Sequence, residues 1–266
     1  MTSTPICPDV ITPESVVPAE LRPRLGFLYP RGGSGFEYYR FAEHFRDNLR
    51  CYLIGGMHAF GGNKTHYREP LMQMGSVENL SYPTRAMRPL DVHAGMWATT
   101  SASFIGGMQW SLDQAKAVSD ILGAPVSNTA LAFVSATRAV GAERVAVLAS
   151  YPHEVTDAFR SFLGEADIAV TDFVHLDADC GEDAFEMEEQ FLIDEALKLD
   201  YTGAQALLIP DTAMAAFPLI APLERELGIP VLTANQVTIF EALRLAGARV
   251  ATQAYGTLFS GAEIRS

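Results

Sequence analysis

The chain has 266 residues, with 32 acidic against 19 basic side chains and a formal net charge of −13. Phosphate backbones and anionic lipids repel such a chain, so we expect neither a nucleic-acid nor a membrane partner. Hydrophobic residues make up 48% and charged residues 19%, which is the mix of a packed domain rather than a disordered chain. The first residues lack the basic and apolar regions of a signal peptide, so none is expected.

Three cysteines, Cys7, Cys51 and Cys180, stand far apart in the sequence and form no C-x-x-C pair. This pattern excludes a disulfide framework and a sulfur-rich zinc site, and it favours a reducing, cytoplasmic location. The six histidines show no metal-binding spacing, so no metal site is predicted. The acidic residues around Cys180 predict a raised thiol pKa and therefore a poor nucleophile.

The N-terminal part of the chain begins with residues 1–23, which hold five prolines and are predicted to form an extended arm. A strand over 24–29 and an aromatic-rich helix over 36–49 follow. Residues 55–70 contain four glycines, two histidines and no clear period. They fit two interpretations equally, a mobile loop over a site and an ordinary long surface loop.

Beyond residue 92, short apolar runs alternate regularly with helical patterns. The predicted strands cover 95–99, 144–150, 169–174, 204–209 and 230–233. The predicted helices cover 111–122, 129–140, 155–163, 184–199, 219–227 and 237–246. Short apolar strands between helices are typical of a parallel sheet covered on both faces, so the fold class is α/β.

An internal repeat divides this pattern into two copies. Gly123-Ala-Pro-Val126 is matched by Gly228-Ile-Pro-Val231, an offset of 228 − 123 = 105. Gly141 and Gly247, at the ends of the helices that follow, are offset by 247 − 141 = 106. We therefore predict two similar Rossmann-like lobes with parallel sheets, related by a pseudo-twofold around a shared cleft. The first lobe is predicted to hold residues 24–128 with 234–266, and the second residues 129–233.

Ligands of open parallel sheets bind at the carboxyl ends of the strands, so the residues that follow the strands are the candidate site. In the first copy these are Thr99, Thr100 and Ser101, and in the second they are Asp211 and Thr212. Hydroxyl and backbone N–H groups at such turns suit an anion, although the same residue types also serve as helix N-caps. Asp211 follows an apolar run and is a candidate general acid or base.

Two further residues extend the candidate site. Tyr151 ends the strand over 144–150 and could donate a phenolic hydrogen bond to the same anion, or be a half-buried aromatic ring. Arg31 would place a cation beside the cleft of an acidic protein. The glycines that follow Arg31 lack the spacing of a nucleotide-binding loop.

Several motifs resemble the aspartate/glutamate racemase superfamily. They are 99–104, Gly123-Ala-Pro-Val126, 144–151, Leu227-Gly-Ile-Pro-Val231, Ala234-Asn-Gln236 and 241–247. The most similar branch holds arylmalonate decarboxylase, maleate cis–trans isomerase and the ectoine-utilisation proteins, and the similarity covers roughly residues 24 to 250. The resemblance implies two Rossmann-like lobes, an active site between them and no cofactor.

The sequence departs from the superfamily at both catalytic positions. The superfamily usually carries a cysteine at each of two strand ends, but here Thr99 and Asp211 hold these positions. By the resemblance, Thr100, Ser101, Tyr151 and Thr212 correspond to the pocket that holds a carboxylate. Asn235 and Arg31 complete the expected substrate-binding set.

These residues favour a cofactor-independent lyase or isomerase acting on a small carboxylic or dicarboxylic acid. Asp211 would exchange the proton, whereas the hydroxyl of Thr99 cannot act as a base at neutral pH. One acid/base group fits a one-proton reaction such as decarboxylation better than a two-base racemisation. Two alternatives stay open: a hydrolase in which Asp211 activates water, and a catalytically silent carboxylate binder. The sequence also leaves a homo-oligomer open.

Overall fold

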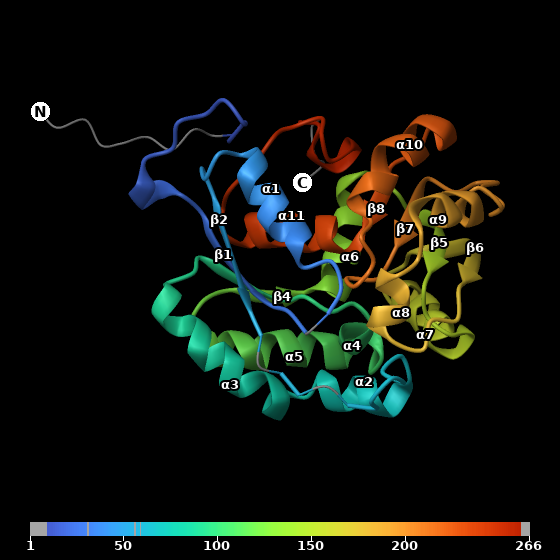
Figure 1. The fold of residues 1–266 in the computed structure, drawn as a ribbon, viewed down its shortest axis with the longest axis horizontal. Coiled ribbons are helices and arrows are strands. Elements are labelled where there is room, and N and C mark those ends of the chain that lie inside the picture. The colour runs from blue at the N-terminus through green and yellow to red at the C-terminus, as the bar shows by residue number, and fades with distance from the viewer. Residues whose placement is uncertain (1–9, 31, 56, 59, 262–266) are drawn as a thin grey trace, which may run out of the picture.

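The computed structural model describes residues 10–30, 32–55, 57–58 and 60–261. It contains two four-stranded parallel sheets, with strand orders β2-β1-β3-β4 and β6-β5-β7-β8 (Figure 1). The strands are β1 (Arg24–Leu28), β2 (Arg50–Ile54), β3 (Ala94–Trp97), β4 (Val126–Asn128), β5 (Arg144–Ala149), β6 (Ala169–His175), β7 (Ala206–Ile209) and β8 (Val231–Thr233). The two strand orders are equivalent, because adding four to each strand number of the first sheet gives the order of the second sheet. The α/β fold of two similar halves is confirmed.

The helices cover both faces of the two sheets. Along the first half of the sequence they are α1 (Phe36–His44), α2 (Arg68–Met74), α3 (Val77–Met87), α4 (Ser101–Phe104), α5 (Gly107–Leu122) and α6 (Thr129–Ala139). Along the second half of the sequence they are α7 (His153–Gly164), α8 (Gly181–Phe185), α9 (Glu189–Ala196), α10 (Phe217–Leu227) and α11 (Ala234–Leu245). Figure 1 shows α3 and α5 on one side of the first sheet and α1 and α11 on the other.

The last α-helix of the described residues, α11, returns to the first sheet. Although α11 directly follows β8 of the second sheet, it packs on β1, β3 and β4 and lies along α6. Ten consecutive residues of α11, 234–243, are buried. The helix α6, which follows β4, contacts β8 in the same manner. These two helices therefore join the halves through a shared apolar cluster, while a second cluster lies within the second half.

The sheets are apolar on both faces because helices cover both. All four residues of β3 and all four of β7 are buried. Gly33 lies where two segments approach each other closely, and its φ is +76°. A Cβ atom at this position would lie 2.6 Å from the Cα atom of Ala213. This contact joins the segment after β1 to the segment after β7, so only glycine fits there.

The first predicted helix was wrong in its length. The helix expected over 36–49 ends at His44, because Arg46 and Asp47 adopt φ angles of 51° and 60°, outside the range of a right-handed helix. This turn leads into β2, which the sequence pattern did not reveal. The helices α2 and α3 were missed as well, and the single helix expected over 184–199 is broken into α8 and α9.

The described part of the N-terminal arm, from residue 10, lies against the C-terminal segment. Ile11 forms a β-bridge with Val250 and is buried. The backbone N–H of Val17 donates to Oδ1 of Asn48 at 3.0 Å. Among the described helices, none is both long and apolar enough to cross a membrane.

Candidate active site

The carboxyl ends of β1, β3 and β7 open into one cavity of about 470 Å³. Its polar lining from the strand ends consists of Tyr29, Thr99, Ser101, Asp211 and Thr212. The segment between β2 and α2 contributes His58 and His66, and α8 contributes Glu182. The structure therefore brings four of the predicted site residues, Thr99, Ser101, Asp211 and Thr212, to one cavity between the two halves.

Thr99 and Thr100 follow β3 in the first half. The hydroxyl of Thr99 is buried and has no hydrogen-bond partner among the described residues. Thr100 occupies the N-cap position of α4, but its side chain makes no capping hydrogen bond. The capping alternative is thus not observed for Thr100. A buried hydroxyl that lines a cavity without a partner is suited to bind a ligand oxygen.

Asp211 occupies the equivalent place after β7 and is only 3% exposed. Its Oδ1 atom accepts the backbone N–H of Ala213 at 2.9 Å, and its Oδ2 atom accepts the hydroxyl of Ser150. This is a local turn rather than a helix cap, since α10 begins only at Phe217. Both oxygens accept hydrogen bonds, which is the pattern of a carboxylate.

His66 lies beside Asp211, with Nε2 3.9 Å from Oδ2. It comes from the segment expected to be either a loop over a site or a surface loop, and the structure places it over the site. The backbone N–H of His66 donates to the carbonyl of Asp179 at 2.9 Å, which attaches the segment to the second half. No sequence signal identified His66, because a lone histidine in an aperiodic loop has no recognisable spacing.

Two tyrosines occupy equivalent places after β1 and β5. The hydroxyl of Tyr29 donates to the carbonyl of Thr212 at 2.9 Å, and that of Tyr151 donates to the carbonyl of Pro210. Burial, and then the negative charge of Asp211, raise the pKa of both tyrosines, so both remain protonated donors. Sequence reasoning missed Tyr29, although a Tyr-Pro pair at both strand ends was a usable signal.

Tyr151 reaches the site from behind the cavity wall. It does not line the cavity, and burial raises the pKa of its hydroxyl well above the ordinary value, an effect that the nearby Thr100 and Ser101 oppose. Its ring packs edge-on against the ring of His66, with the centroids 5.0 Å apart. Tyr151 therefore supports the hydroxyl groups of the first half and the imidazole over the cavity.

Asn235 is buried behind the cavity instead of lining it. Its Nδ2 atom donates to Ser34 Oγ and to Glu37 Oε2, both at 2.8 Å, and its Oδ1 atom accepts the hydroxyl of Tyr38 at 2.9 Å. The protein thus satisfies the polar atoms of Asn235, and the structure does not bring this residue together with the cavity-lining set. Its Nδ2 atom also lies 3.2 Å from the carbonyl of Thr212, which supports the turn after β7.

Glu37 connects the two halves beneath this network. Its Oε1 atom accepts the backbone N–H of Phe217, at the start of α10, at 2.7 Å. Burial raises the pKa of Glu37 to about 7, against the opposing effect of the hydrogen bonds from Asn235 and Phe217. The carboxyl group of Glu37 therefore titrates near neutral pH inside the interface between the halves.

The remaining predicted groups lie elsewhere. Arg31 and Cys7 fall outside the described residues. Burial raises the pKa of Cys51 to about 12, and burial, more than the neighbouring Asp183, raises that of Cys180. Neither of these two cysteines lines the cavity. Within the described ranges, no group of three or more His, Cys, Asp or Glu side chains is arranged to hold a metal ion.

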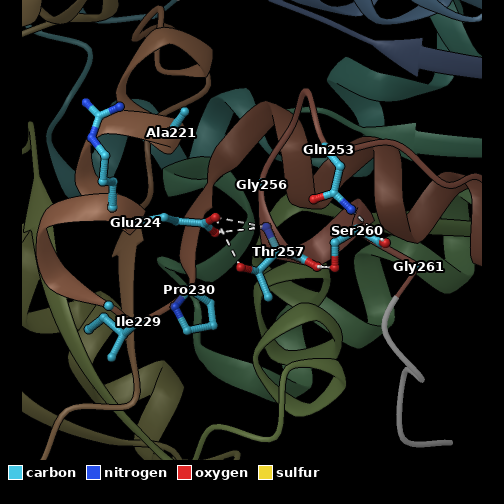
Figure 2. Close-up of a pocket in the computed structure, with 11 residues that line it drawn as sticks. Ala221, Glu224, Ile229, Pro230, Gln253, Gly256, Thr257, Ser260 and Gly261 are labelled. Carbon is cyan, nitrogen blue, oxygen red and sulfur yellow. Dashed lines mark hydrogen bonds between the residues drawn. The ribbon is translucent and has the colours of Figure 1, made fainter.

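A second hollow, of about 850 Å³, lies away from the strand carboxyl ends, between α10 and the C-terminal segment. Figure 2 shows Glu224 pointing at Thr257 there. The carboxylate of Glu224 accepts two hydrogen bonds from Thr257, one from its backbone N–H at 3.0 Å and one from the Thr257 hydroxyl at 3.1 Å. It also accepts the backbone N–H of Val231 at 3.1 Å. The carboxylate of Glu224 is thus already bound by the protein itself, and this hollow does not lie at the strand carboxyl ends, so the cavity beside Asp211 is the better candidate site.

Comparisons with known proteins agree with the fold and the motifs. The sequence profile of the arylmalonate decarboxylase family matches residues 77–259. A maleate isomerase of Geobacillus stearothermophilus is 27% identical over 139 residues, which are 52% of this chain and 55% of the isomerase. The arylmalonate decarboxylase of Bordetella bronchiseptica is 26% identical over 163 residues, 60% of this chain and 68% of that enzyme. The matched segment thus spans about half the length of the maleate isomerase.

Solved structures extend the likeness to almost the whole chain. A variant of the maleate isomerase Iso from Pseudomonas putida S16, crystallised with maleate, superimposes with a TM-score of 0.80 at 18% identity. The match covers 91% of this chain and 99% of that one. At this identity the superposition shows the shared fold. The resemblance found in the motifs is confirmed, and the chain belongs to the arylmalonate decarboxylase family.

Proposed function

We propose that this protein is a cofactor-independent lyase or isomerase that acts on a small carboxylic or dicarboxylic acid. The observation that carries the proposal is the pairing of Thr99 with Asp211. One is a buried hydroxyl without a partner and the other a buried carboxyl group, and they follow equivalent strands of the two halves into one cavity. A site of this kind offers hydrogen bonds for an anion on one side and a proton-transfer group on the other.

The hydroxyl groups would bind and polarise the substrate carboxylate. Thr99 and Ser101 lie where they can donate to its oxygens, and Thr100 and Tyr151 support them from behind. As the reaction proceeds, negative charge gathers on these oxygens in an enediolate-like state. Preorganised donors stabilise such charge more strongly in the transition state than in the substrate.

Asp211 would complete the reaction by proton transfer. In a decarboxylation the C–C bond to the leaving carboxylate breaks, carbon dioxide departs, and the electron pair remains on the substrate carbon. This carbon then takes a proton supplied at Asp211, and water restores the proton to the enzyme. We favour this one-proton reaction because the hydroxyl of Thr99, the equivalent residue of the other half, cannot act as a base near neutral pH.

The test is a product analysis over a panel of small acids, starting with an arylmalonate and maleate because the relatives' names point to them. A thermal-shift screen selects the ligands first, since a ligand at 100 times its Kd stabilises by about 2.7 kcal/mol. Release of carbon dioxide, or a cis–trans change, that is lost in Asp211→Asn supports the proposal. A new acid with an alcohol or amine would indicate a hydrolase instead. Binding without turnover across the panel would indicate a silent carboxylate binder.

A further inference from the structure

The pairing of His66 with Asp211 adds a second ionisable group to the site. The Nε2 atom of His66 and the Oδ2 atom of Asp211 are 3.9 Å apart, and their side chains are only 7% and 4% exposed. Both residues line the cavity. They come from different halves of the molecule and are separated by 211 − 66 = 145 positions in the sequence. The tertiary fold alone creates this contact.

The surroundings of the imidazole decide where its hydrogen atoms lie. The Nδ1 atom of His66 is 3.0 Å from the carbonyl oxygen of Ala178. A carbonyl oxygen can only accept, so Nδ1 must carry a hydrogen atom. A neutral ring then directs the lone pair of Nε2, rather than an N–H group, toward Asp211. Two acceptors that face each other in a buried place repel, and a proton on either of them removes this repulsion.

The contacts of Asp211 favour placing that proton on the histidine. The carboxylate already accepts the N–H of Ala213 and the hydroxyl of Ser150, which stabilise its charged form. A negatively charged Asp211 next to the ring in turn stabilises a proton on Nε2. The resulting pair holds one mobile proton at the wall of the cavity.

The other titratable groups near the ring do not replace Asp211 as its partner. Glu182 and His58 line the same cavity, but neither forms a hydrogen bond or an ion pair with the imidazole of His66. Asp179 is nearby, but its carboxylate accepts the hydroxyl of Tyr67. Tyr151 contacts the ring, and Tyr29 lies across the cavity; burial keeps both hydroxyls protonated. Among the described lining residues there is no lysine or arginine.

We propose that His66 is the second proton-transfer residue of the site, which stores the reacting proton on Nε2 beside Asp211. This inference rests on the proposed function and adds a proton donor next to Asp211, because Asp211 in its ionised form has no proton of its own to give. The proton on Nε2 forms the new C–H bond with the electron pair left on the substrate carbon. The ring regains its lone pair, and water returns a proton to it. The two groups act as one unit on one side of the substrate.

The first test needs no substrate and uses ¹⁵N NMR of the histidine rings in the full-length protein. We expect the neutral ring of His66 to carry its hydrogen on Nδ1, and Asp211→Asn to change the ¹⁵N signals of this ring because the charged neighbour of Nε2 is removed. The exposed pair of His153 and Asp157, 3.2 Å apart, is the control, and Asp157→Asn should alter His153 much less. A neutral His66 ring with its hydrogen on Nε2, or no effect of Asp211→Asn on this ring, would overturn the inference.

The second test uses two substitutions that keep different contacts. His66→Asn retains an amide donor near the carbonyl of Ala178, and His66→Gln retains a donor that reaches toward Asp211. Neither amide can act as an acid or a base near neutral pH. We expect both to lower kcat about 100-fold or more with little change in KM, and to remove one limb of the pH–rate profile. His153→Gln, with its side chain 60% exposed, should keep the parent rate. If Asp211→Asn abolishes turnover while both His66 variants retain it, this inference fails and the proposed function stands.

Discussion

Replacing Glu37 by glutamine should change how the stability of the protein depends on pH. Burial raises the pKa of this carboxyl from its ordinary value of 4.5 to about 7 in the folded state. Between these two values the folded state holds a proton on Glu37 that the unfolded chain releases. The free energy of unfolding therefore falls as the pH rises from 4.5 to 7, because ionisation favours the unfolded chain.

The size of the effect follows from the two pKa values. The difference is 7 − 4.5 = 2.5 units, and at 1.36 kcal/mol per unit the full loss is about 3 kcal/mol. Part of it has already occurred at pH 5, so about 2 to 3 kcal/mol remains to be lost between pH 5 and pH 8. Glu37→Gln cannot ionise, and it should lack this loss even if its stability at pH 5 is reduced by the altered contact with Asn235.

Urea unfolding of both proteins at pH 5, 6, 7 and 8 measures this difference directly. The stability of Glu37→Gln relative to the wild type should rise from pH 5 to pH 7 and level off toward pH 8. Glu43→Gln, at an exposed position of the same helix, is the matched control and should follow the wild type at every pH. If the difference between Glu37→Gln and the wild type stays constant from pH 5 to pH 8, the carboxyl of Glu37 does not titrate within the interface as argued.

Three further outcomes are expected at the site. Asp211→Asn should reduce turnover about 10² to 10⁴-fold while ligand affinity changes far less, as steady-state kinetics and calorimetry will show; an unchanged rate would remove Asp211 from the mechanism. Thr99→Val combined with Ser101→Ala should weaken carboxylate binding by about 3 to 6 kcal/mol, at about 1.5 to 3 for each hydrogen bond to a charged group, and unchanged affinity would show that these hydroxyls do not contact the ligand. Iodoacetamide should leave activity largely intact, because Cys51 and Cys180 are buried and do not line the cavity; loss of turnover in a folded protein would place a thiol in the site.

The sequence predicted the parts of the fold that depend on local pattern. The alternation of apolar runs and helices was enough for two parallel sheets, and the repeated glycine motifs were enough for the identical topology of the halves. The strand β2 escaped because the turn before it uses Arg46 and Asp47 at positive φ rather than glycine or proline. Because this turn contains neither glycine nor proline, the sequence gives no sign of it.

The candidate site shows the same distinction, between residues that a local pattern reveals and residues that only the tertiary fold brings together. Thr99 and Asp211 were identified because strand ends and repeat positions can be read along the chain. His66 could not be, since its importance arises from a contact between segments of different halves. Asn235 shows the opposite case: its motif pointed to the site, but its contacts with Ser34, Glu37 and Tyr38 hold it behind the cavity wall.

The return of α11 to the first sheet determines when that sheet can be completed during synthesis. The strand β4 ends at Asn128, but α11 ends only at Leu245, so 245 − 128 = 117 further residues must be made first. At a synthesis rate of about 5 to 20 residues per second, α11 is completed about 6 to 23 s after β4, and until then it cannot cover the sheet. A ribosome-bound chain of this protein therefore exposes for seconds the part of the sheet that α11 covers, which is a target for chaperones until α11 emerges.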